Sequence, residues 1–145
     1  MVKRSGFTLV ELLITLVVIG VLTAMSVLFF TNTALQGRDA EREADVAALS
    51  RLLESYYLKR GAYPLLSAVS STTLPGLNAD LLVAPGAAGG NSLVSTTTPS
   101  KIQYGYVTYT ADMTPCTSGT NCGKKYLLTW YSEATQSIQK KASLN

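Results

Sequence analysis

The feature that most constrains this chain is a long apolar run close to its N-terminus. No side chain from residue 12 to residue 30 carries a charge, and Glu11 is the one charge among the 24 residues from 7 to 30. As an α-helix this run would extend about 36 Å, enough to cross a hydrocarbon core of about 30 Å. Lys3 and Arg4 precede the run, which predicts that the N-terminus faces the cytoplasm and the rest of the chain lies outside.

A cleaved secretory signal is the first alternative for such a run. Signals have an apolar core of about 7–15 residues, followed by a cleavage site flanked by small residues. Here the small residues near Ala24 and Ser26 are followed by four more apolar residues, 27–30. The run is therefore too long for a signal, and we expect a membrane anchor.

Composition excludes several classes of function. Charged residues make up 14% of the chain, well below the usual share of about 25%. Without Lys3 and Arg4 the charge balance is 10 − 9 = +1, so basicity does not indicate sequence-specific nucleic-acid binding. The chain has no histidine and two cysteines. We therefore expect no enzyme activity, no metal site and no cofactor.

Glu11 needs an explanation, because a carboxylate inside a membrane helix costs about 2.5–3.5 kcal/mol. One hypothesis places it near the interface, reaching toward water. The other gives it a partner. If the chain is cut after Gly6, Phe7 gains an ammonium four residues before Glu11. Helices packed with an axial shift would then pair the ammonium of one chain with the carboxylate of the next, and a wrong register would leave a charge unpaired.

These residues carry a resemblance to a known family. The run Lys3-Arg4-Ser5-Gly6 followed by Phe7-Thr8-Leu9-Val10-Glu11-Leu12-Leu13 resembles the cleavage site of type IV prepilins and type II secretion pseudopilins. The resemblance implies that a prepilin peptidase, a membrane aspartic peptidase, cuts between Gly6 and Phe7 and N-methylates Phe7. It implies that Glu11 neutralises the amine of a neighbouring subunit in a helical homopolymer. An assembly platform protein and an ATPase are the further partners that it implies.

A second helical segment follows the apolar run. Val46, Leu49, Leu53 and Tyr56 recur at helical spacing. The charged stretch 38–45 and the other polar positions predict a solvated face, comprising Arg42, Asp45, Arg51 and Lys59. Gly61 is a plausible C-cap and Pro64 forbids continuation, so one helix from about residue 7 to 60 is expected. The resemblance to pseudopilins and pilins extends to about residue 64. Unlike many pilins, the chain has no proline before Pro64, and whether the helix unwinds near Gly20 stays open.

The C-terminal part predicts a small sheet. Residues 65–100 are rich in Ser, Thr, Gly and Ala and predict loops, with one turn around residues 77–83. Strands are expected at 102–110 and 125–131, and a weaker third at 133–138. The aromatic residues there indicate packing against the helix rather than a ligand surface; they are Tyr104, Tyr106, Tyr109, Tyr126, Trp130 and Tyr131.

Two cysteines lie between the expected strands. Cys116 and Cys122 flank five residues, and an extracytoplasmic location permits a disulfide there, with free thiols or metal ligation as the alternatives. Major pseudopilins often hold calcium near their C-terminal loops. Asp112 and Asn121 are the oxygen ligands nearby, too few to support that site here.

Together these features predict an α+β, type IV pilin-like fold, in which a long N-terminal helix packs on a small antiparallel β-sheet. The expected parts are a leader (1–6), a membrane and filament-core helix (7–30), an amphipathic helix (31–61), an αβ-loop (62–100) and a sheet with a disulfide loop (101–145). The resemblance implies a type IV pilus subunit that is a single-pass membrane protein before assembly and a surface filament afterwards. The alternatives are a type II secretion pseudopilin and a membrane-anchored binding module. The cysteine pair and the missing calcium loop favour the pilin.

Overall fold

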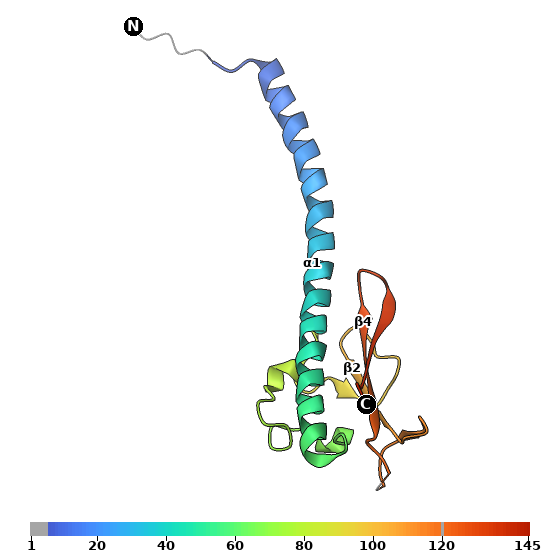
Figure 1. Ribbon diagram of the computed structural model, residues 1–145. Coiled ribbons are helices and arrows are strands. Elements are labelled where there is room, and N and C mark those ends of the chain that lie inside the picture. The colour runs from blue at the N-terminus through green and yellow to red at the C-terminus, as the bar shows by residue number, and fades with distance from the viewer. Residues whose placement is uncertain (1–5, 120) are drawn as a thin grey trace. The chain divides into compact units, whose positions relative to one another are not determined.

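The computed structural model describes residues 6–119 and 121–145, and it leaves out the side chains of residues 27–29 and 31. The expected leader cations Lys3 and Arg4 lie outside the described residues. The chain divides into two compact units, Met1–Leu35 and Gln36–Asn145. The elements, labelled in Figure 1 where there is room, are α1 (Leu9–Arg60), the 3-10 turns η1 (Leu66–Ala68) and η2 (Ala79–Leu82), and strands β1 (Leu93–Val94), β2 (Tyr104–Tyr109), β3 (Pro115–Cys116), β4 (Lys125–Ser132) and β5 (Ser137–Ala142).

Helix α1 is a single element of 52 residues, which confirms the long N-terminal helix. It ends as the sequence predicts, because Gly61 adopts φ +71° and its N–H donates to the Tyr57 carbonyl at 2.7 Å. A residue with a Cβ would be strained in this left-handed conformation. Lys59 and Arg60 occupy the last turn, where the helix dipole favours cations.

The sheet has the strand order β1-β2-β4-β5, with β3 paired to β2 at the side. Strands β2, β4 and β5 are antiparallel, and so are β2 and β3. The expectation of a purely antiparallel sheet is wrong at one edge, where Leu93 and Val94 pair with β2 in parallel. Two residues inside a polar loop are too few to show alternation, so β1 has no recognisable pattern in the sequence.

The third expected strand is also displaced. β5 begins at Ser137 and ends at Ala142, whereas the sequence predicted a strand at residues 133–138. Residues 133–136 form the turn between β4 and β5, and Gln136 adopts φ +50° there. The two lysines of β5 made this strand difficult to predict from the sequence, because charged residues are uncommon in buried strands but frequent at sheet edges.

The core of the second unit lies between α1 and the sheet. Val46, Leu49 and Leu53 are buried on the helix, at the spacing that the sequence showed. The aromatic residues are mainly core residues: Tyr104, Tyr106, Tyr109 and Tyr126 are buried, and Trp130 packs against the cluster. The loop residues Leu74, Leu77 and Leu82 close this core. The predicted helix-packing role is therefore confirmed for Tyr104, Tyr106, Tyr126 and Trp130, whereas Tyr109 is buried outside the cluster that contains the helix residues.

The expected solvated face of α1 needs a correction. Arg42 is 1% exposed and is among the most deeply buried residues of the described chain. It precedes Val46 by four residues and Leu49 by seven, so helical periodicity places it on the buried stripe. Asp45 is half-buried, whereas Arg51 and Lys59 are exposed as expected.

Candidate processing and assembly site

Gly6 and Phe7 precede the first residue of α1 by three and two positions. Both are exposed, and the Phe7 side chain retains 84% of its accessible surface. Backbone groups inside a helix are engaged in hydrogen bonds, and a peptidase must first release them. The bond between Gly6 and Phe7 lies outside the helix, so its backbone is open to a peptidase.

Thr8 and Glu11 form a reciprocal cap at the start of α1. The Thr8 N–H and Oγ1 donate to Glu11 Oε2 at 2.8 and 2.7 Å, and the Glu11 N–H donates to Thr8 Oγ1 at 3.2 Å. This is a capping box, in which a threonine and a glutamate three residues later satisfy each other's exposed backbone donors. Thr8 was not predicted as a partner of Glu11, although Thr-x-x-Glu before an apolar run is the sequence signal for a capping box. Glu11 therefore has a partner within its own chain before any neighbour supplies one.

The rest of the first unit presents an apolar surface. Fourteen large apolar side chains among the described residues 7–30 are at least half exposed, from Val18 at 50% to Phe7 at 84%. Residues Leu9–Ser26 have a mean hydropathy of 2.4, and none of this window is buried. The polar side chains within it bond to the helix itself: the hydroxyls of Thr15, Thr23 and Ser26 donate to backbone carbonyls three or four residues earlier, each at 2.8 Å. Such a helix fits a membrane anchor, because it leaves no hydroxyl donor unsatisfied in lipid.

In the second unit, an ion-pair network joins α1 to the β4–β5 turn. Arg38 donates to both carboxylate oxygens of Glu133, at 2.9 and 2.8 Å. Arg42 bridges Glu133 at 2.6 Å and Asp39 at 2.9 Å, and it also donates to the Lys101 carbonyl at 2.8 Å. Its Nε has no hydrogen-bond partner among the described residues. The two carboxylates compensate the charge of the buried guanidinium. A buried charge without such partners would be strongly destabilising.

Asp39 fixes the same turn by its hydrogen bonds. It accepts from Ser132 Oγ at 2.8 Å and from the N–H groups of Glu133 and Ala134, both at 2.9 Å. Burial tends to raise the pKa of Asp39, but these donors and Arg42 lower it below its ordinary value. Hydrogen bonds from Arg38, with those from Arg42, lower the pKa of Glu133 to about 2. Both groups are ionised near neutral pH, so the network is fully charged there.

The predicted disulfide is present. Cys116 and Cys122 are joined, with their Cα atoms 5.7 Å apart. Thr108 Oγ1 donates to the Cys116 carbonyl at 2.8 Å, which holds the loop against β2. No group of three or more His, Cys, Asp or Glu side chains able to hold a metal ion occurs in residues 6–119 and 121–145.

An exposed Gly-Phe bond before a capped apolar helix that leads into an α+β domain is the arrangement that the resemblance to prepilins implies. Residues 1–27 match the family model described as the prokaryotic N-terminal methylation motif. The chain is 34% identical over 83 residues to the type II secretion system core protein G of Escherichia coli K12, covering 54% of this chain and 57% of that protein. It is 32% identical over 62 residues to the protein of the same name from Pseudomonas aeruginosa, covering 43% of this chain and 44% of that one.

These comparisons show that the chain is similar to proteins of the type IV pilin and pseudopilin family. The chain spans about half the length of the curated relatives that it matches.

Proposed function

We propose that this chain is the precursor of a type IV pilus-like filament subunit. Prepilin peptidase cuts it between Gly6 and Phe7 and methylates the new amine of Phe7. The apolar helix first anchors the chain in the cytoplasmic membrane, with the C-terminal unit outside, and then leaves the bilayer for the filament core. A platform membrane protein and an ATPase drive this transfer.

The observation that carries the proposal is the apolar surface of the first unit. Its large side chains between residues 7 and 25 are all at least half exposed, and such a surface is stable only in lipid or against other apolar helices. A filament core offers the same apolar surroundings as the bilayer, which makes exchange between the two environments energetically feasible.

Glu11 specifies register in the proposed filament. Cleavage leaves the Phe7 ammonium one helical turn before the Glu11 carboxylate. In the apolar core an unpaired charge is strongly unfavourable, so only the axial shift that pairs both charges between neighbours is stable. The Thr8 bonds keep the carboxylate satisfied until the neighbour's amine arrives.

Mass spectrometry of the intact chain tests the processing step. The cellular protein should lack residues 1–6 and carry one additional methyl group on Phe7. A strain without the peptidase should retain the full chain. A cellular product that begins at Met1 in the presence of active peptidase would instead indicate an anchored module that is never assembled.

A second candidate is a pseudopilin of a type II secretion system, and it is favoured by the two relatives, whose names both describe a core protein of that system. Deletion of the gene separates the candidates. Loss of surface filaments supports the pilin, whereas retention of secreted enzymes in the periplasm with unchanged surface filaments supports the pseudopilin.

A further inference from the structure

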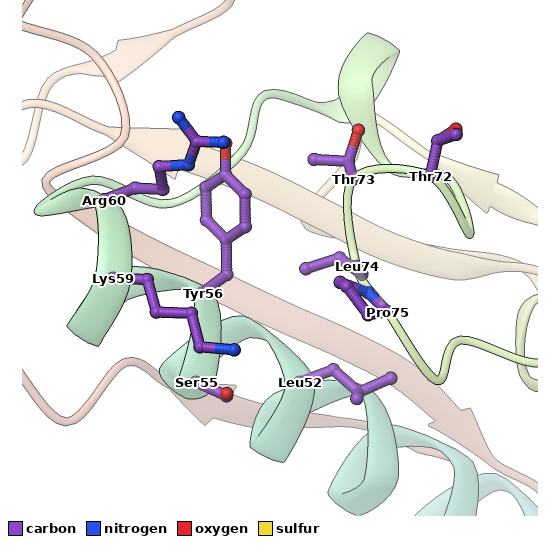
Figure 2. Close-up of a pocket in the computed structure, with 9 residues that line it drawn as sticks. All are labelled: Leu52, Ser55, Tyr56, Lys59, Arg60, Thr72, Thr73, Leu74 and Pro75. Atoms are coloured by element: carbon purple, nitrogen blue, oxygen red, sulfur yellow. The ribbon is translucent and has the colours of Figure 1, made fainter.

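The second unit carries a cleft at the C-terminal end of α1. Its volume is about 170 Å³. One wall comes from α1 and the other from residues 72–75, as Figure 2 shows. The floor is apolar, with the buried Leu74 and the half-buried Leu52, and the exposed residues Pro75, Lys59 and Arg60 lie at the rim. Both cations are exposed, and neither forms an ion pair with a carboxylate among the described residues.

The complementary feature is a projecting turn after β2. Residues 111–114 are all exposed, and Met113 keeps 57% of its surface. Asp112 beside it forms no ion pair with any described residue. This turn, residues 110–114, therefore presents an apolar side chain next to a free carboxylate.

The turn is held in shape before any partner binds. The Thr110 N–H donates to the Thr114 carbonyl at 3.0 Å, and the Met113 N–H donates to the Thr110 carbonyl at 3.2 Å. Met113 adopts φ +60°, a left-handed conformation that is costly for a residue with a side chain. A large apolar residue that is 57% exposed thus occupies a position where glycine would be more stable.

We propose that the turn at residues 110–114 of one copy of this chain docks into the cleft of a second copy. Met113 contacts the apolar floor, and the Asp112 carboxylate pairs with Lys59 and Arg60 at the rim. The inference rests on the proposed filament function and names one contact between its subunits.

The placement of the two features rules out a contact within one copy. Figure 1 shows residues 72–75 and residues 110–114 on opposite sides of the C-terminal end of α1. A contact between two different patches of the same chain is heterologous, so each added copy offers a free cleft and a free turn. Such a contact propagates along a filament instead of closing into a dimer.

Charge reversal tests the pairing. Lys59→Glu and Asp112→Lys should each lower the yield of filaments from cells about tenfold, because like charges then face each other, and the double variant should recover most of the yield. Lys140→Glu, an exposed reversal on β5, serves as the control and should assemble normally. Normal assembly of both single variants, or no recovery in the double variant, would overturn the proposal.

Cysteine cross-linking tests the geometry directly. A chain carrying both Lys59→Cys and Asp112→Cys should give a ladder of multimers under oxidation in filaments, whereas either single variant should give dimers at most. Filaments of the double variant without a ladder contradict the docking contact alone. Absence of filaments from the unmodified chain contradicts the proposed function, and the docking contact with it.

The variant Met113→Gly distinguishes an effect on docking from an effect on the stability of the fold. Glycine fits the left-handed backbone better than methionine, so the thermal unfolding temperature of the variant should equal or exceed that of the unmodified chain. Filament yield should nevertheless fall. Unchanged filament yield with unchanged stability would show that the Met113 side chain does not dock.

Discussion

At the residue scale, the most informative side chain of the second unit is Arg42. Its position on the buried stripe was available from the spacing to Val46 and Leu49, but its charge suggested a solvated face. Its partner Asp39 lies three residues earlier on the same helix, but its second carboxylate partner, Glu133, is not predictable from the sequence, because it is 91 residues away. An ion pair between residues so far apart in the sequence can be recognised only once the helix and the strands are placed in three dimensions.

Removing the shared carboxylate should be costly. We expect Glu133→Gln to lower the free energy of unfolding by about 3 kcal/mol, because Arg42 loses one of two compensating charges while it stays buried. Chemical denaturation of the full chain in detergent, followed by circular dichroism, measures this change. Lys140→Glu is a surface control and should change stability by less than about 0.5 kcal/mol. Equal stability of Glu133→Gln and the unmodified chain would contradict the role of the network.

Acid should weaken the same network. The pKa of Glu133 is lowered from its ordinary 4.5 to about 2, so its contribution to stability is complete above about pH 5 and is lost as the pH falls toward 2. We predict that unfolding temperatures of the unmodified chain fall over this range more steeply than those of Glu133→Gln. Parallel pH profiles of the two proteins would contradict the assignment.

At Gly105 there is no room for a side chain. A Cβ there would overlap the Thr129 hydroxyl and the Thr96 carbonyl, because the loop after β1 crosses the sheet at this point. Gly105→Ala should therefore destabilise the chain by about 1–3 kcal/mol. Gly37→Ala, with open space around it on α1, should stabilise the chain by about 1 kcal/mol and is the matched control. Thermal unfolding compares the two.

At the element scale, regular patterns made most of the fold predictable. The apolar run and the spacing of Val46, Leu49 and Leu53 predicted α1, and alternating β-prone residues predicted β2 and β4. Strands β1 and β5 could not be assigned, since one has two residues and the other carries lysines at a sheet edge. Of the candidate site, Glu11 is recognisable by its charge in an apolar run, whereas its bond to Thr8 depends on the local geometry at the helix start.

The disulfide loop belongs to this scale as well. Closing so short a loop should stabilise the fold by about 2–2.5 kcal/mol in the chain-entropy model. We expect Cys116→Ser together with Cys122→Ser to lower the free energy of unfolding by this amount, measured by denaturation without reductant. The unmodified chain in reductant should behave like the double variant. No difference between oxidised and reduced protein would show that the loop is held by its hydrogen bonds alone.

At the scale of the whole molecule, the two units differ in which residues they expose and which they bury. The first exposes apolar residues and a single carboxylate, and the second buries a core and holds its partly buried charges in ion pairs or in hydrogen bonds with tyrosine hydroxyls. Loss of residues 1–6 removes two cations and creates one ammonium at Phe7. In the proposed filament, the Glu11 carboxylate of a neighbouring subunit neutralises this new ammonium.

Glu11→Gln is the most direct test of this charge pairing. Glutamine keeps the capping box with Thr8, since its side-chain oxygen can accept the same hydrogen bonds, but it removes the negative charge. Filament yield from cells that express Glu11→Gln is the quantity to measure, with intact mass as the check on processing. We predict chains cut after Gly6 but few or no filaments. Normal filaments from Glu11→Gln would contradict the pairing of the Glu11 carboxylate with a neighbour's Phe7 amine.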